Sequence, residues 1–183
     1  MNTLPAHNQT LSIEAYLQGE LETEIKHEYL AGDIVAMGGA SRAHGLMATA
    51  LGGLLWPSAR RRKCQLFISD MKVRVEHDSG TYFYYPDLLV TCDPSDDERL
   101  FCTRPCLIVE ILSPGTERID RREKLLAYRL LPSLREYLLV DPEKLLIERY
   151  WKSGEQWQHE TLTEGNLAVA CLDCEIAIAE LYD

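Results

Sequence analysis

The stretch Pro105-Cys106-Leu107-Ile108-Val109-Glu110-Ile111-Leu112-Ser113 decides the fold of this chain. It is short and almost wholly apolar, and Ser113-Pro114-Gly115 closes it, which is the pattern of a buried β-strand. A carboxylate nevertheless stands in its middle. Because an ionised Glu in a protein core must be paired, metal-bound or protonated, Glu110 marks a candidate site inside the predicted sheet.

A second acid lies at the mouth of another apolar segment, Tyr85-Pro86-Asp87-Leu88-Leu89-Val90. The segments that carry Asp87 and Glu110 are predicted to be adjacent strands, so the two carboxylates could converge on one metal ion. Oxygen ligands of this kind suit Mg²⁺ or Mn²⁺, which also coordinate phosphate. Such an ion can activate water and offset the charge that develops on a scissile phosphate.

A helix is predicted after this strand, ending before Pro132, with Asp120 and Glu123 as a capping box. Its first turns contain Lys124, and a lysine there could stabilise a phosphate or orient the water. Asp120, Lys124 and Tyr128 are spaced four apart, so we expect them to share one helical face.

Length and composition predict one globular domain. The chain has 183 residues, of which 46% are hydrophobic, so it can bury an ordinary core. We expect residues 1–183 to form a single domain, with residues 1–10 as a flexible tail. A helix from Ser41 is expected to end at Pro57, and residues 65–76 and 81–90 are each predicted to form one strand. Helices and strands in this order predict an α+β fold with a mixed sheet and helices packed against it.

Charge and hydropathy restrict the location and the partners. The N-terminus lacks a basic-then-apolar signal pattern and no apolar run approaches the ~20 residues that span a bilayer, so we expect a soluble, cytoplasmic protein. The formal net charge of −10 argues against non-specific affinity for nucleic acid. Positive charge is nevertheless clustered at residues 60–63 and 118–124, either as solvated surface or, for the second cluster, beside the acidic strand.

The six cysteines do not resemble a disulfide scaffold in a chain of this length. We expect them to be small core residues of a protein in a reducing compartment. Cys171 and Cys174 have metal-like spacing, and Cys102 and Cys106 could be their partners, but no turn glycine follows either pair. A structural zinc site is therefore not expected.

An ordered set of motifs resembles the PD-(D/E)xK nuclease superfamily and, within it, the Uma-two family of restriction-endonuclease-like proteins. The match covers the chain from about Glu20 to its end. The motifs that carry it are, in chain order, His27-Glu28-Tyr29-Leu30-Ala31-Gly32-Asp33, His44, Tyr85-Pro86-Asp87, Val109-Glu110-Ile111-Leu112-Ser113-Pro114, Asp120-Arg121-Arg122-Glu123-Lys124, Tyr128 and residues 132–141.

The resemblance implies a restriction-endonuclease-like central mixed sheet flanked by helices, with Asp87 and Glu110 as metal ligands. Glu28 is implied as a further site carboxylate that supports the metal or its water. One position departs from the superfamily pattern: two residues after the glutamate stands Leu112 instead of lysine. Lys124, on the next helix, is the implied replacement, since a helix docked on the sheet can direct a long amine at the same spot.

Each candidate residue has a structural alternative. Glu110 could form a buried ion pair with Arg121 or Arg122, and Asp87 could cap a strand edge. Lys124 and Glu28 could be ordinary surface charges. His44, in the first turn of its helix, could receive a phosphate or act as a cap.

Tyr128 could serve packing alone. The aromatic residues Tyr150, Trp151 and Trp157 could stack bases, cover a sheet face or form a dimer contact.

The leading hypothesis is a Mg²⁺-dependent endonuclease that hydrolyses phosphodiester bonds in DNA by metal-activated water attack. In this hypothesis Asp87 and Glu110 hold the metal, Lys124 stabilises the transition state, and Glu28 and His44 assist. One rival is a non-catalytic binding or regulatory protein on a nuclease-like fold, favoured by the net charge and by Leu112. Another is a nuclease acting on RNA or small nucleotides. A homodimer is expected by analogy only.

Overall fold

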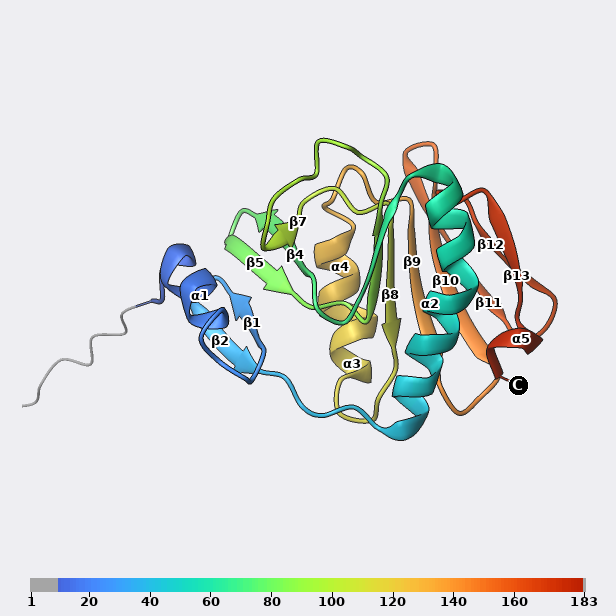
Figure 1. Ribbon diagram of the computed structural model, residues 1–183, viewed down its shortest axis with the longest axis horizontal. Coiled ribbons are helices and arrows are strands. Elements are labelled where there is room, and N and C mark those ends of the chain that lie inside the picture. The colour runs from blue at the N-terminus through green and yellow to red at the C-terminus, as the bar shows by residue number, and fades with distance from the viewer. Residues whose placement is uncertain (1–9, 183) are drawn as a thin grey trace, which may run out of the picture.

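The computed structural model describes residues 10–182, so the expected tail lies almost entirely outside the described residues (Figure 1). The helical elements are α1 (Ile13–Glu20), α2 (Arg42–Arg62), α3 (Glu117–Ile119), the π-helical turn η1 (Asp120–Lys124), α4 (Leu125–Tyr128) and α5 (Ala179–Tyr182). The strands are β1 (His27–Leu30), β2 (Asp33–Ala36), β3 (Gln65–Ile68), β4 (Lys72–His77), β5 (Gly80–Tyr84), β6 (Leu88–Thr91), β7 (Phe101–Cys102), β8 (Leu107–Ile111), β9 (Glu136–Asp141), β10 (Leu146–Ser153), β11 (Gln156–Leu162), β12 (Asn166–Val169) and β13 (Cys174–Ala177).

The stretch that contains Glu110 forms β8, inside a six-stranded mixed sheet of order β11-β10-β9-β8-β6-β3. β8 runs parallel to β9 and antiparallel to β6. Neighbours on both sides bury every residue of β8, which explains why its sequence is a continuous apolar run. Glu110 is thus held within the sheet by two strands.

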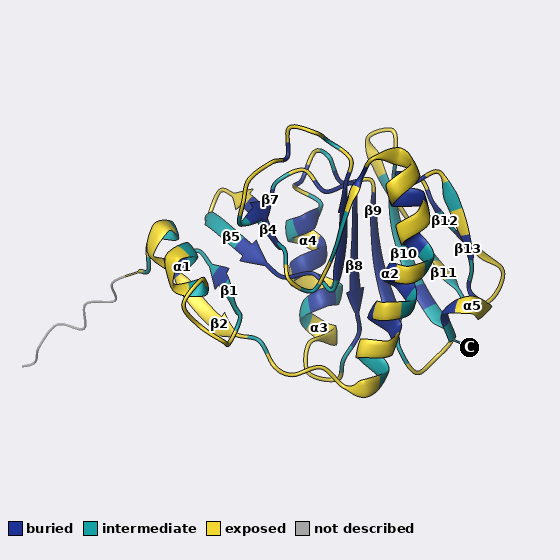
Figure 2. Cartoon of the chain, in the orientation of Figure 1, coloured by how far each residue is buried: buried dark blue, intermediate teal, exposed yellow. Residues whose placement is uncertain are grey.

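Side chains of β8 alternate between two cores because successive residues of a strand point to opposite faces. Leu107, Val109 and Ile111 pack in one hydrophobic cluster with α2 and the C-terminal β12–β13 hairpin. Ile108 packs in another cluster, with α4 and β4. By the same alternation Glu110 faces the α4 side, where Lys124 lies, and Figure 2 shows β8 and β9 buried between the two layers.

A five-stranded sheet of order β2-β1-β5-β4-β7 forms the other lobe, to which α1 is attached (Figure 1). Tyr16 of α1 packs with Tyr29, Phe83 and Phe101 in a small aromatic core. β4 of this sheet also contributes Val73 and Val75 to the cluster that contains Ile108. This packing places β1, and with it Glu28, beside the six-stranded sheet.

Both predicted long strands are in fact divided between the two sheets. Residues 65–76 form β3 and β4, because the chain turns at Ser69, whose φ is +60°. Residues 81–90 form β5 and β6, with Tyr85–Asp87 between them. Asp87 therefore stands at the point where the chain passes from one sheet into the other.

The expected helix end at Pro57 was wrong, because α2 continues to Arg62. Pro inside a helix costs roughly 3 kcal/mol. Here the buried residues Ser58 and Ala59 follow Pro57, so the apolar face of the helix continues against the sheet and offsets this cost. None of the helices formed by residues 10–182 is long and apolar enough to cross a membrane.

The expectation that the cysteines serve only as small core residues was also wrong. Disulfides join Cys64 to Cys92 and Cys106 to Cys171, whereas Cys102 and Cys174 are free. The paired cysteines are 28 and 65 residues apart, so no local spacing announces either bond.

Candidate active site

Asp87 and Glu110 are neighbours on antiparallel strands. Leu88 pairs with Val109, which places the preceding Asp87 opposite Glu110. Asp87 Oδ2 accepts a hydrogen bond of 2.6 Å from the backbone N–H of Ile111 and lies 3.1 Å from His44 Nε2. The Asp87 side chain is 15% exposed and that of Glu110 is 4% exposed, so Asp87 is the more solvent-exposed of the two acids.

Lys124 reaches the same spot from the helix that follows β8. Its Nζ lies 3.1 Å from Glu110 Oε1, 2.9 Å from Glu28 Oε1 and 3.3 Å from Asp120 Oδ1. The residue belongs to η1, and isolated π-helical turns of this kind occur frequently at functional sites. One buried ammonium group is therefore shared among three carboxylates.

Two buried tyrosines hold Glu110 and the π-helical turn in place through hydrogen bonds. Tyr128 donates a hydrogen bond of 2.9 Å to Glu110 Oε1 and is fully buried. Tyr137 of β9 donates one of 3.0 Å to the backbone carbonyl of Asp120, which anchors the π-helical turn to the sheet. Thr116 also donates a hydrogen bond to Asp120, over 2.7 Å to Oδ2. The side chains of the site are thus held by packed neighbours.

His44 enters from the first turn of α2. The Ser41 side chain accepts a hydrogen bond from the His44 backbone N–H, so Ser41 is the N-cap of the helix that the sequence predicted from this residue. The hydrogen bond to Asp87 raises the pKa of His44, outweighing the opposing effect of its burial. Asp87 thus has partners on both sides, a backbone amide and an imidazole.

Burial dominates the electrostatics of Glu110 and Asp120. It raises the pKa of Glu110 well above the ordinary value, against the favourable charge of Lys124 and with a further push from Asp87, Asp120 and Glu28. Burial also raises the pKa of Asp120. For Lys124, burial alone would lower the pKa, but the surrounding carboxylates reverse this and raise it, so the ammonium stays charged.

The acids outnumber the cations. Glu28, Asp87, Glu110 and Asp120 face one lysine and one histidine, and the structure leaves Glu28 Oε1 and Asp120 Oδ1 buried without a hydrogen bond of good geometry. An excess of carboxylate oxygens with unfilled lone pairs is the donor set that a hard divalent cation requires. The residues present therefore fit a Mg²⁺ or Mn²⁺ ion.

The site opens into a cleft of about 1060 Å³. Its walls are the β2–α2 linker with Gly38 and Gly39, the loop after β8 with Ser113, and the β9–β10 turn with Lys144. All four acids, His44 and Lys124 line this cleft. A bound molecule would therefore meet the acids and the lysine together.

The structure brings together every candidate that the sequence singled out, namely Glu28, His44, Asp87, Glu110 and Lys124. It also adds Asp120, whose predicted capping-box role was wrong because the helix begins earlier, at Glu117. The spacing of four residues between Asp120 and Lys124 was the signal that could have revealed the additional acid. The rival partner Arg121 pairs with Glu117 and Glu148 instead of Glu110.

This chain is similar to known proteins in sequence and in fold. Residues 13–179 match the family model Uma2, described as "Putative restriction endonuclease". The chain belongs to the Uma2 family. It is 40% identical over 146 residues to one uncharacterized protein of Synechocystis sp., covering 79% of this chain and 76% of that protein. A second uncharacterized Synechocystis protein is 35% identical over 156 residues, covering 83% and 87% of the two chains.

A solved structure supports the fold independently of close sequence similarity. It is a crystal structure from Anabaena variabilis, described as "a putative nuclease belonging to DUF820", with a TM-score of 0.74 and 18% identity. The match covers 91% of this chain and 96% of the other. The restriction-endonuclease-like α+β fold is therefore confirmed, and family and fold together point to a nuclease.

Proposed function

We propose that this member of the Uma2 family is a Mg²⁺- or Mn²⁺-dependent endonuclease that hydrolyses phosphodiester bonds in DNA. The observation that supports it most is the excess of four carboxylates over one lysine at the floor of an open cleft. Such an excess of acids over cations in a cleft favours a functional site, because each uncompensated charge destabilises the fold.

Asp87 and Glu110 would hold the metal, and Glu28 would support it or its water. When bound, a divalent ion supplies an activated water and positive charge at the scissile phosphate. Asp87 is held by the Ile111 amide and by His44, so its carboxylate is fixed before a ligand arrives. This preorganisation is what an oxygen-ligated site on a strand end needs.

Lys124 would stabilise the charge that develops on the phosphate. Its ammonium has three N–H donors and lies among three carboxylates at the cleft floor, so a phosphate oxygen would compete for one donor. Lys124 replaces the lysine that is missing at Leu112, which packs in the core near α4. His44, in the first turn of α2, would assist at the phosphate or the leaving oxygen.

The test combines metal binding and cleavage on the same samples. Calorimetry with Mg²⁺ and Mn²⁺, together with nicking of supercoiled plasmid, would compare the wild type with Asp87→Asn. Glu155→Gln, which alters an exposed acid in the β10–β11 turn, is the matched control. We expect metal binding and plasmid nicking in the wild type and in the control, and neither in Asp87→Asn.

A non-catalytic binding protein is the alternative, favoured by the net charge of −10, which opposes approach to nucleic acid. Metal binding without cleavage of DNA, RNA or short oligonucleotides would favour it, whereas cleavage of RNA alone would change only the substrate. No metal binding near millimolar concentration would remove the catalytic proposal. Sedimentation of the same samples would test the expected homodimer.

A further inference from the structure

Four cysteines gather at the end of the six-stranded sheet opposite Asp87 and Glu110. Cys64 immediately precedes β3, Cys92 immediately follows β6 and Cys106 immediately precedes β8. These three strands are neighbours, and the pairing of Gln65 with Thr91 places Cys64 beside Cys92. Cys171 comes from the turn between β12 and β13 and covers this end of the sheet.

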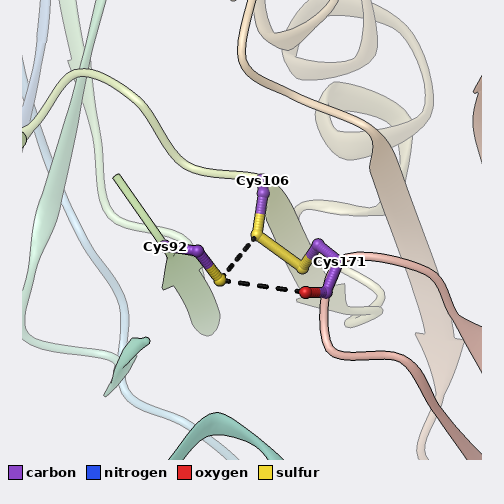
Figure 3. Close-up of side chains that lie close together, drawn as sticks. All are labelled: Cys92, Cys106 and Cys171. Atoms are coloured by element: carbon purple, nitrogen blue, oxygen red, sulfur yellow. Dashed lines mark hydrogen bonds between the residues drawn. A yellow bond between two sulfur atoms is a disulfide. The ribbon is translucent and has the colours of Figure 1, made fainter. Parts of the chain in front are cut away.

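The two disulfides lie against each other. Figure 3 shows Cys106 bonded to Cys171, with Cys92 beside them. Cys92 Sγ lies 3.7 Å from Cys106 Sγ and 3.8 Å from the backbone carbonyl oxygen of Cys171. While both disulfides are closed, neither sulfur carries a proton, so the sulfur–sulfur approach is a packing contact. It places one disulfide within direct reach of the other.

The two disulfides differ in their access to solvent. Cys106 is 7% exposed and Cys171 is 3% exposed, so a dissolved thiol cannot approach their bond directly. Cys64 is also 7% exposed, whereas Cys92 is the most accessible of the four cysteines. Thiol–disulfide exchange requires a thiolate to reach a sulfur of the disulfide. An external reductant therefore meets Cys92 first.

We propose that Cys92 is a thiol-exchange site through which a small dithiol opens the buried Cys106–Cys171 disulfide. The dithiol attacks Cys92, and Cys64 leaves as a thiolate. The second thiol of the reagent then closes onto the first, which releases Cys92 as a thiolate and the reagent as a disulfide. Two electrons have moved from the dithiol to the Cys64–Cys92 pair.

The electrons then pass inward by exchange alone. The Cys92 thiolate attacks Cys106, the Cys106–Cys171 bond breaks, and Cys171 leaves as a thiolate that takes up a proton. Cys64 then attacks Cys92, restoring the Cys64–Cys92 disulfide and releasing Cys106, which also takes up a proton. The net result is a dithiol oxidised, the inner disulfide reduced and the outer one unchanged.

The inner disulfide ties the C-terminal hairpin to the central sheet. Cys106 adjoins β8, whereas Cys171 lies between the strands of the β12–β13 hairpin. Once this bond opens, the hairpin keeps its apolar contacts through Leu167, Leu172 and Ile176 but loses its covalent link to the core. Exchange at Cys92 would therefore control the attachment of this hairpin.

A metal site is the competing interpretation, since the Sγ atoms of Cys92, Cys106 and Cys171 lie within 4.8 Å of one another. Structural zinc sites usually take cysteines in closely spaced pairs. Here each cysteine comes from a different segment, and the structure already bonds all four in two disulfides. Disulfide exchange therefore accounts for these contacts better than ligation does.

The first experiment follows the reduction of the full-length protein by dithiothreitol, with alkylation and peptide mapping at each time point. We expect an early species in which Cys64 and Cys171 are alkylated while Cys92 and Cys106 are bonded to each other. A Cys64→Ser/Cys92→Ser variant should open its inner disulfide at least about tenfold more slowly, because the relay is lost. Cys174→Ser, which alters a free cysteine, should reduce like the wild type.

The second experiment needs no reductant and uses Cys64→Ser alone. Its Cys92 has lost its disulfide partner and can attack Cys106, so mapping should find a Cys92–Cys106 disulfide and a free Cys171 thiol in part of the sample. Circular dichroism would establish that the variant is folded. An inner disulfide left wholly intact in this variant, or one that opens at the wild-type rate in the double variant, would overturn the proposal. One tightly bound zinc per chain with four reduced thiols would overturn it as well.

Discussion

Glu110 and Glu136 are two buried acids on adjacent parallel strands, yet their surroundings differ. Glu136 of β9 is 1% exposed and receives hydrogen bonds from Arg149 Nε and Nη2, at 3.0 and 2.6 Å, and from the Ala170 amide at 2.6 Å. Glu110 of β8 is 3% exposed and receives its hydrogen bonds from Lys124 and Tyr128, both on Oε1.

The difference lies in how the compensating charge is divided. Both oxygens of Glu136 have donors, and Arg149 shares its fork with only one other acid, Glu160. Lys124 is shared among three acids, and burial raises the pKa of Glu110. Removing one partner of the Glu136–Arg149 pair would leave an uncompensated buried charge, whereas acids that compete for one cation in a cleft indicate a binding site.

The largest effect on stability is expected for Glu136→Gln. The substitution leaves Arg149 in a mostly buried position with Glu160 alone, and breaking a buried pair in this way costs about 3 kcal/mol. Urea denaturation would measure the loss in the free energy of unfolding. Nicking by the fraction that remains folded should be unchanged; a variant as stable as the wild type would contradict a structural role for Glu136.

Divalent cations should stabilise the acid-rich site and leave the Glu136 region unaffected. At a Mg²⁺ concentration one hundred times Kd, the free energy of unfolding should rise by about 2.7 kcal/mol. Thermal denaturation with Mg²⁺ and with chelator would measure this rise. It should persist in Glu136→Gln and disappear in Asp87→Asn; an equal rise in both variants would mean that the ion binds elsewhere.

Glu110→Gln should stabilise the metal-free protein by about 1 kcal/mol at pH 8, because it removes one of the acids that compete for Lys124. The amide oxygen can still accept the hydrogen bonds from Lys124 and Tyr128. Plasmid nicking should nevertheless be lost. Denaturation in chelator and plasmid nicking in Mg²⁺ would show whether the variant gains stability while it loses activity. A loss of stability would show that the Glu110 charge stabilises the fold.

The smallest expected effect is the pH dependence of the stabilisation by Glu110→Gln. Since the folded-state pKa of Glu110 is raised, the native state binds the proton more tightly than the unfolded state does. The contribution of Glu110 to stability is therefore complete below the unfolded pKa and declines as the pH rises. The advantage of Glu110→Gln should shrink from pH 8 to pH 5. If the two proteins differ in free energy of unfolding by the same amount from pH 5 to pH 8 in chelator, the raised pKa of Glu110 is not the cause of the gain.

The sequence predicted β8, the strand that contains Glu110, well because its signal is local. A continuous apolar run between Pro105 and Ser113-Pro114 predicts a central strand, and an acid inside it predicts a site. The four-residue spacing of Asp120, Lys124 and Tyr128 likewise predicted their common face. The roles of these residues in metal binding and catalysis stay predictions.

Features that depend on distant contacts were not predictable in the same way. Glu136 is the first residue of β9, a position where the sequence suggests an exposed acid. Its burial is explained by Arg149 of β10 and the Ala170 amide, which are distant in the chain. The disulfides join segments that are far apart in the chain. Residues 65–76 are divided between two sheets by the turn at Ser69, and a turn signal alone does not show that the strands on its two sides join different sheets.

The π-helical turn gives relatives of this protein a simple diagnostic. A π turn bonds each residue to one five positions away, so it accommodates one residue more than an α-helical turn. Deleting one residue between Asp120 and Lys124 would convert the turn to a regular α-helix and leave Lys124 on nearly the same face, because the wider π turn already absorbs the extra residue. An alignment gap at this place would therefore mark homologues in which a regular α-helix presents the lysine to the acids.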